Sequence, residues 1–406
     1  MTNRQAAIKI VKVLRKNGFE ALLAGGCVRD MLLGRRAKDY DVATNALPVE
    51  IIRLFRRTLK VGAKFGVVMV LLDNQQIEVA TFRSDVDYAD GRHPGSVKFT
   101  NAREDALRRD FTINGMFYDP VAEKVIDYVG GQGDLKKRIL RTIGKPQERF
   151  SEDYLRMLRA VRFSTQLGFA IEPKTFAAIC ENAADITKIS GERICMELEG
   201  ILTNPNRSKG IALLAKSGLG EAIFPKVSLQ QTGFALRVLD FLPQKANFCL
   251  SLAAFFSGCT SESALEELRV LKLSRNQLKH IKFLLVKRGR LLNEKLSLAE
   301  LKMLLGGPYF WDLYYLQLAI QKAANKETGA LKKLKKRIKE LGDVELRPKP
   351  LLNGHELIRL GASPGPDLGR LAREMYTAQL EMEIKTRQDA KQWVLNWLRK
   401  HNAQVN

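Results

Sequence analysis

Apolar positions along the first 140 residues follow two different periods, which predicts a mixture of helices and strands. Apolar residues three and four apart predict a helix over 4–17, and short apolar runs near glycine predict strands. In chain order we then expect a strand at 21–23, a helix at 28–33, a strand carrying 39–41, a helix from Pro48, strands at 66–72 and 77–82, a polar mobile loop at 83–96, a helix around 106–118 and a strand at 124–129. This order predicts an α/β unit, a small mixed sheet with helices against it.

From about Gln132 onward the apolar spacing is almost entirely that of helices. It recurs every 3.6 residues in 152–169, 173–186 and 191–202, and it continues to residue 325. The aromatic-rich stretch 308–320 is expected to pack in a core in preference to stacking on bases. We expect a multidomain protein in which an α/β head is followed by all-α parts, divided as 1–140 (head), 141–205 (neck), 206–325 (body) and 326–406 (tail).

Composition narrows the class of protein. The 406 residues carry a formal net charge of +23, and no run of eighteen apolar residues predicts a membrane span. Five scattered cysteines without a CxxC pair, and an N-terminus without an apolar signal core, favour a reduced, cytoplasmic protein. A solvated lysine-rich surface accounts for part of the charge, but the size of the excess favours a polyanionic partner, most often nucleic acid.

Two aspartates one residue apart form the first candidate site. On a strand, Asp39 and Asp41 would point to the same side, while Tyr40 points to the other. Paired carboxylates suit Mg²⁺, and Glu78 on a neighbouring strand could supply a third for two-metal phosphoryl transfer. The same spacing also occurs in calcium loops and sugar transferases, so the pair alone does not identify the chemistry.

A glycine pair precedes these aspartates. Gly25 and Gly26 follow a predicted strand and precede a predicted helix, so their backbone N–H groups could approach a phosphate closely. Arg29 lies in the first turn of that helix and could fork onto the same phosphates. A simple tight turn is the alternative, but the nearby aspartates favour a site for a triphosphate and a metal.

Three segments together resemble a known family. LLAGGCVRDMLLGRRAKDYDVAT, RRDFTING and EDYLRMLRAVRF, in this order, closely resemble the class II nucleotidyltransferases. These are the bacterial and eukaryotic CCA-adding tRNA nucleotidyltransferases and the related bacterial poly(A) polymerases. The resemblance runs from about residue 20 to 225, weakens through the middle helices and returns near 351–369.

The resemblance implies a polymerase-β-like catalytic head and a role for each matching residue. Asp39 and Asp41 would hold the catalytic Mg²⁺, with Glu78 as a further catalytic carboxylate. The residues implied to bind the nucleotide are Gly25, Gly26, Arg29, Arg109, Asp110, Asn114, Asp153, Arg156, Arg159 and Arg162. Of these, Asp110 and Asn114 match the segment that recognises ribose, and a carboxylate and an amide can indeed hydrogen-bond sugar hydroxyls.

The pair Asp153 and Arg156 offers a way to choose bases without a template. Three residues apart on a helix, they would project from one face. Asp153 could accept from the exocyclic amino group of cytosine or adenine, while Arg156 donates to the adjacent ring nitrogen. Uracil and guanine carry a carbonyl in place of the amino group, and a good base contact discriminates by about 1–3 kcal/mol. An ordinary helix with acidic–basic pairs is the alternative.

The implied activity is addition of C, C and A to the 3′ end of tRNA from CTP and ATP. The tRNA would place its 3′ end in the head and its elbow on body and tail, where 332–340 is a basic amphipathic helix. The loop at 85–96 looks full length, which disfavours a CC-only enzyme. An A-adding enzyme, a poly(A) polymerase and, less favoured, a non-catalytic RNA-binding protein remain open. We expect no obligatory protein partner.

Overall fold

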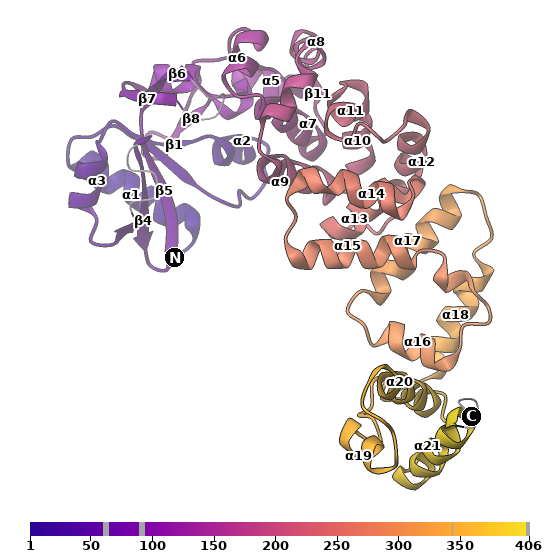
Figure 1. The fold of residues 1–406 in the computed structure, drawn as a ribbon. Helices are drawn as coiled ribbons and strands as arrows, with labels where there is room; N and C mark the ends of the chain where they lie inside the picture. The colour runs from indigo at the N-terminus through magenta and orange to yellow at the C-terminus, as the bar shows by residue number, and fades with distance from the viewer. Residues whose placement is uncertain (60–64, 89–93, 343, 403–406) are drawn as a thin grey trace. The chain divides into compact units, whose positions relative to one another are not determined.

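The computed structural model describes residues 1–59, 65–88, 94–342 and 344–402. The chain divides into two compact units, one formed by Met1–Thr232 and Glu262–Leu273 and the other by Gly233–Ser261 and Ser274–Asn406 (Figure 1). The division into head, neck, body and tail remains a prediction.

A mixed sheet forms the core of the first unit. Among the described residues it has seven strands in the order β3-β4-β5-β2-β1-β8-β9. The strands are β1 (Ala21–Ala24), β2 (Asp41–Thr44), β3 (Thr58–Leu59), β4 (Val67–Leu72), β5 (Gln75–Thr81), β8 (Phe117–Asp119) and β9 (Lys124–Ile126). β2 runs antiparallel to β1 but parallel to β5. The predicted α/β fold with a mixed sheet is therefore confirmed.

Helices cover both faces of this sheet. α1 (Asn3–Lys16) is held at its start by a capping box between Thr2 and Gln5, and it packs on β1, β2 and β5. α3 (Pro48–Leu54) packs beside α1 on β4 and β5. On the other face, Leu22, Ala24 and Ala43 pack against Ala102 and Ala106 of α4 (Ala102–Leu107). Asp41 shares this second face with Ala43, because residues two apart on a strand point the same way.

Two predicted elements near the sheet are wrong. The segment 106–118 is not one helix: α4 ends at Leu107, a 3₁₀ turn covers Thr112–Asn114, and β8 follows. Buried Phe111 bridges to Thr142, and the backbone N–H of Thr112 donates to the carbonyl of Arg141. This pairing with a distant segment satisfies backbone groups that a helix would otherwise have paired locally.

The polar stretch 83–96 was expected to be a mobile loop, and it is instead largely a hairpin. β6 (Arg83–Tyr88) pairs antiparallel with β7 (Pro94–Phe99). The central residues 89–93 lie outside the described residues. Two smaller shifts occur upstream, where α2 spans Gly26–Leu32 and β2 begins only at Asp41, so that Asp39 precedes the strand.

Helices make up most of the remainder of the first unit, as predicted. They are α5 (Gly131–Lys137), α6 (Pro146–Glu152), α7 (Leu155–Leu167), α8 (Pro173–Glu181), α9 (Gly191–Leu202), α10 (Arg207–Lys216), α11 (Leu219–Ile223) and α14 (Ser261–Glu267). A short parallel pair, β10 (Ile139–Leu140) and β11 (Ala170–Ile171), lies among them. The predicted single helix at 152–169 is wrong at its start, because Asp153 is extended between α6 and α7.

The second unit is helical throughout its described part, which has no strand. Its helices are α12 (Leu229–Asp240, shared with the first unit), α13 (Phe248–Phe255), α15 (Arg275–Lys287), α16 (Leu298–Leu305), α17 (Phe310–Ala323), α18 (Gly329–Glu340), α19 (Gly354–Arg359), α20 (Pro366–Leu380) and α21 (Arg387–Asn402). In α17, Phe310 and Tyr314 are buried as expected, whereas Trp311 and Tyr315 are exposed. None of the described helices is long and apolar enough to span a membrane.

Gly131, in α5, is expected to be essential for the close packing of this helix against Thr112 and Met116. A Cβ on Gly131 would lie 2.3 Å from the carbonyl oxygen of Thr112 and 2.8 Å from Cγ of Met116. We expect Gly131→Ala to lower the free energy of unfolding by about 1–3 kcal/mol, because the core would be overpacked.

Gly133 in the same helix is the matched control, because a Cβ there would meet no atom within 4 Å. Gly133→Ala should be neutral or stabilising by up to about 1 kcal/mol, since alanine favours helix. Urea unfolding of both variants is the measurement. Equal stability of the two proteins would contradict the tight packing at Gly131.

Candidate active site

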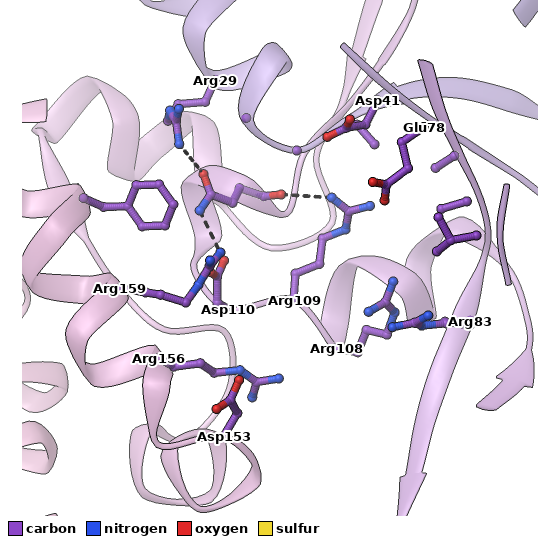
Figure 2. Close-up of a pocket in the computed structure, with 18 of the residues that line it drawn as sticks. Arg29, Asp41, Glu78, Arg83, Arg108, Arg109, Asp110, Asp153, Arg156 and Arg159 are labelled. Carbon is purple, nitrogen blue, oxygen red and sulfur yellow. Dashed lines mark hydrogen bonds and ion pairs between the residues drawn. The ribbon is translucent and has the colours of Figure 1, made fainter. Parts of the chain in front are cut away.

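A cavity of about 530 Å³ in the first unit collects most of the predicted site residues (Figure 2). Of the thirteen candidates, eleven line it, and Asp39 and Arg162 do not. They come from five separate stretches: the β1–α2 turn, β2, β5, the turn after α4, and the start of α7. The sheet and the helices after it therefore bring together residues up to 134 positions apart, between Gly25 and Arg159.

Asp41 and Glu78 form the acidic side of the cavity. They lie on adjacent parallel strands whose register pairs Val42 with Val79, and Figure 2 shows both carboxylates near Arg109. Asp41 is open to solvent, but the surrounding protein limits its hydration. This desolvation, together with repulsion from Glu78 and Asp39, raises the pKa of Asp41 to about 6, against the opposing effect of Arg109.

Asp39 lies just outside this acidic side. Burial alternates from Asp39 to Val42, so both aspartates are exposed while Tyr40 is buried, but of the two only Asp41 lines the cavity. Within the described residues, no three histidine, cysteine, aspartate or glutamate side chains are grouped closely enough to hold a metal ion. The described residues therefore hold no ready-made site with three carboxylates. Carboxylates without a neutralising charge repel one another, which favours keeping them apart. Asp41 and Glu78 nevertheless offer the carboxylate oxygens that a divalent cation prefers.

The glycine turn shapes the cavity wall next to these carboxylates. Gly25 has a φ of +74°, and its N–H donates to the carbonyl of Met116 at 3.3 Å. A Cβ at Gly25 would lie 3.1 Å from Nη1 of Arg109. Glycine is therefore required here both for the backbone conformation and for the close approach of the arginine.

A chain of hydrogen bonds crosses the floor of the cavity (Figure 2). Nη1 of Arg29 donates to Oδ1 of Asn114 at 2.7 Å, and Nδ2 of Asn114 donates to Oδ1 of Asp110 at 3.2 Å. Arg159 donates twice to Oδ2 of Asp110, at 2.9 and 2.6 Å. Burial alone would raise the pKa of Asp110, but Arg159 and the hydrogen bonds outweigh it and hold that pKa below its usual value.

The proposed base-reading pair lies at the opposite end of the cavity from Asp41 (Figure 2). Asp153 and Arg156 are not on one helix face, because Asp153 precedes α7, yet both line the cavity. Oδ2 of Asp153 accepts from Nη2 of Arg193 at 2.7 Å. Arg156 is buried and donates to Glu152 and, at 2.8 Å, to the carbonyl of Arg149. Each member of the pair is therefore held by a separate partner.

Arg162 is placed away from the cavity. Its Nε donates to Oε2 of Glu197 at 2.6 Å, and its guanidinium lies 4.2 Å from the ring centre of Phe163. Arg162 therefore joins α7 to α9 through Glu197, and its predicted contact with the nucleotide has no support from the lining of the cavity.

Sequence reasoning missed three arginines that also line the cavity: Arg83, Arg108 and Arg193. Arg193 lies in GERICMELEGIL, which the sequence predicts to be a helix within the span that resembles the family, and no local signal pointed to its link with Asp153. Its Nη1 is buried and has no hydrogen-bond partner among the described residues. With these three, the cavity has seven arginines against four carboxylates, a balance suited to a polyanionic ligand.

Comparisons with known proteins relate the chain to families that act on RNA ends. Residues 21–141 match the family described as Poly A polymerase head domain, and residues 168–230 match the one described as Probable RNA and SrmB-binding site of polymerase A. The chain is 44% identical over 237 residues to a CCA-adding enzyme of Geobacillus kaustophilus, a match that covers 57% of this chain and only 58% of that relative's length.

Two further similarities extend along nearly the whole chain. A CCA-adding enzyme of Lactobacillus johnsonii is 34% identical over 395 residues, with 95% of each chain covered. The crystal structure of the Bacillus stearothermophilus CCA-adding enzyme in complex with CTP matches with a TM-score of 0.84 and 29% identity, covering 100% of both chains. The fold of the head and of the helical remainder is therefore that of these proteins.

The Asp110–Arg159 pair predicts a pH-dependent contribution to stability. Because the pKa of Asp110 is lower in the folded state than its value of about 3.9 in the unfolded chain, its carboxylate stabilises the fold above that pH. The contribution is lost as the pH falls through the folded-state pKa. Asp110→Asn should therefore lower the free energy of unfolding by about 1–3 kcal/mol at pH 7, and by less near pH 3.

Urea unfolding of both proteins between pH 7 and pH 3 is the measurement. The difference between wild type and variant should narrow as the pH falls below 4. A difference independent of pH would show that Asp110 contributes through its shape and neutral hydrogen bonds, contrary to this interpretation.

Proposed function

The chain belongs to the family of CCA-adding enzymes, within the class II nucleotidyltransferases, and on that premise we propose that it adds C, C and A to the 3′ end of tRNA. CTP and ATP would be the substrates and pyrophosphate the second product. The observation that carries this proposal is one cavity that combines a carboxylate pair, several arginines and the Asp153–Arg156 pair. The reaction would take place in the cytoplasm.

In the proposed reaction the terminal 3′-hydroxyl of the tRNA attacks the α-phosphate, and pyrophosphate leaves in line. Asp41 and Glu78, with Asp39 nearby, would hold divalent cations, for which Mg²⁺ is the best match to carboxylate and phosphate oxygens. Such a cation, when bound, lowers the pKa of the hydroxyl and neutralises the leaving group. Arg29 and Arg109, on either side of the glycine turn, would hold the triphosphate.

Recognition of the sugar would fall to the hydrogen-bonded floor. Asn114 lines the cavity together with Arg29 and Arg159. Its Nδ2 carries a second N–H besides the one that it donates to Asp110. Asp110 is saturated by Phe111, Asn114 and Arg159, so we assign it to orienting Asn114 and Arg159. The oxygen of a ribose hydroxyl could then accept a hydrogen bond from the second N–H of Asn114.

Base selection would depend on Asp153 and Arg156. Cytosine and adenine both present an amino donor beside a ring-nitrogen acceptor, which complements a carboxylate beside a guanidinium. Arg193 holds Asp153, and Glu152 holds Arg156, so the two groups are oriented before the base enters. Uracil and guanine would set a carbonyl against Asp153 and leave buried polar groups unpaired.

The RNA itself would extend over the helical part of the chain. In α18, Leu331 and Leu334 are buried, while Lys332, Lys333, Lys335, Lys336 and Lys339 face solvent. Such a stripe of lysines suits the phosphates of a folded RNA, independent of its sequence.

A poly(A) polymerase is the second candidate, because the match over residues 21–141 is to a domain described for those enzymes. The two candidates share the cavity and differ in product length. A non-catalytic RNA-binding protein is disfavoured, since RNA binding alone would not require Asp41 and Glu78 next to Arg109.

Product length is the test. Purified protein should be given tRNA transcripts ending before, within and after CC, with each triphosphate separately and together, and the products should be sequenced. We expect completion to CCA and no further addition. Asp41→Asn should abolish incorporation while tRNA affinity stays within about twofold, because the change removes one charge from the acidic side only. A long A tail would favour the second candidate, and no incorporation by wild type would reject both.

Base choice gives a separate prediction. Arg156→Met removes the donor to the ring nitrogen, so incorporation of UTP or GTP relative to CTP should rise by roughly 5- to 150-fold, the value of one base contact. Arg103→Met, an exposed arginine of α4 outside the cavity, is the control. Competition assays with all four triphosphates are the measurement, and an unchanged preference in Arg156→Met would remove this residue from base selection.

A further inference from the structure

A buried carboxylate lies immediately behind the arginine side of the cavity. Asp105, in α4, is 1% exposed and does not itself line the cavity, whereas the two arginines that follow it, Arg108 and Arg109, both do. No feature of the sequence singled it out, and the reaction proposed above assigns it no part.

Both arginines are bound to Asp105 by two hydrogen bonds each. Nε and Nη2 of Arg108 donate to Oδ1 at 2.9 and 2.7 Å. Nε and Nη2 of Arg109 donate to Oδ2 at 3.1 and 2.8 Å. The backbone N–H of Arg83, at the start of β6, also donates to Oδ1 at 3.3 Å. One carboxylate therefore fixes two neighbouring guanidiniums and the base of a hairpin.

The far edge of Arg109 is fixed as well. Its Nη1 donates to the carbonyl of Asn114 at 3.3 Å, and its guanidinium lies 5.0 Å from the ring centre of Phe117. Figure 2 shows Arg109 extending toward Asp41 and Glu78 from below, with Arg108 on the side of Arg83. The glycine at position 25 leaves the space that this orientation needs.

Two adjacent arginines repel each other and each has many rotamers, so their shared orientation needs a cause. Long side chains also lose rotamer entropy when they are fixed in one orientation. Asp105 supplies both the opposite charge and the geometry, because each oxygen accepts the Nε–Nη2 edge of one guanidinium. Burial would raise the pKa of Asp105, but Arg109 and Arg108 outweigh it and lower that pKa, which keeps the carboxylate ionised.

We propose that Asp105 is a positioning residue that presents Arg108 and Arg109 as a fixed pair to the polyphosphate of the incoming nucleotide. This inference rests on the nucleotide-binding role proposed for the cavity. One carboxylate between two guanidiniums leaves one positive charge in excess at the wall. Because the carboxylate lies behind the arginines, the ligand meets the cations and not the anion.

Asp105→Asn is the variant that tests this role. Asparagine keeps one acceptor oxygen and sets an NH₂ group against the other guanidinium, so one arginine should lose its orientation. Binding of CTP and of inorganic tripolyphosphate to the full chain should both weaken by roughly 10- to 100-fold, the value of hydrogen bonds to charged groups. Isothermal titration calorimetry measures both, and tripolyphosphate isolates the phosphate contacts from those to base and sugar.

Asp134→Asn is the matched control. Asp134 is also buried, accepts from Oγ1 of Thr112 at 2.8 Å and from Nε of Arg141 at 3.1 Å, and does not line the cavity. The Asp134→Asn variant should lose thermal stability, while its affinity for CTP and for tripolyphosphate should stay within about threefold of wild type. Asp105→Glu keeps both acceptor oxygens and should bind both probes more tightly than Asp105→Asn. It also provides the comparison with wild type if the asparagine variant does not fold.

Unchanged affinity in Asp105→Asn and Asp105→Glu would overturn the proposal. So would a loss confined to CTP, since the arginines would then serve the base or sugar and not the phosphates. An equal loss of affinity in Asp134→Asn would reduce Asp105 to a general stabilising residue. If wild type itself binds neither probe, the nucleotide-binding role of the cavity fails, and the inference about Asp105 fails with it.

Discussion

The site depends on one constraint: a charged side chain in a partly buried cavity must be held by an opposite charge. Removing one partner of such a pair is destabilising, because the other charge is left uncompensated. Here Arg159 pairs with Asp110, Arg193 with Asp153 and Glu152 with Arg156. Each pair joins segments that also form the walls, so the interactions that stabilise the first unit also orient its functional groups.

The acidic side of the cavity departs from this rule in an informative way. Asp41 and Glu78 lie on adjacent strands, and desolvation together with repulsion from Glu78 and Asp39 raises the pKa of Asp41 to about 6 despite the opposing charge of Arg109. Elsewhere in the cavity, arginines outnumber carboxylates. A ligand with several negative charges, accompanied by a divalent cation, would correct both imbalances at once, which is why a nucleoside triphosphate suits the cavity better than a neutral molecule.

The sheet explains how so few residues define so specific a site. β2 lies between β1 and β5, so the glycine turn after β1, Asp41 on β2 and Glu78 on β5 reach the same part of one face. α4 packs on that face through Ala102 and Ala106, which brings its last turn beside the same point. The sheet and α4 therefore contribute the side of the cavity that we propose binds the phosphates and the metal, while the start of α7 contributes the end proposed to read the base.

The sequence by itself determined the class of fold and the order of most elements, and eleven of the thirteen residues that it proposed for the site line one cavity. The fold class and the first candidates follow from local patterns: apolar periodicity, a glycine pair between a strand and a helix, and two aspartates one residue apart. The other candidates, such as Arg109, Asp110 and Asn114, come from the resemblance to a family. Only the tertiary structure decided that Phe111 pairs with Thr142 and prevents a helix at 106–118, and that 83–88 pairs with 94–99. It alone placed Asp153 ahead of α7, beside Arg193, and Arg162 outside the cavity. The reason is physical, since these outcomes depend on contacts between residues that are far apart in the chain, and local propensity carries no information about such partners.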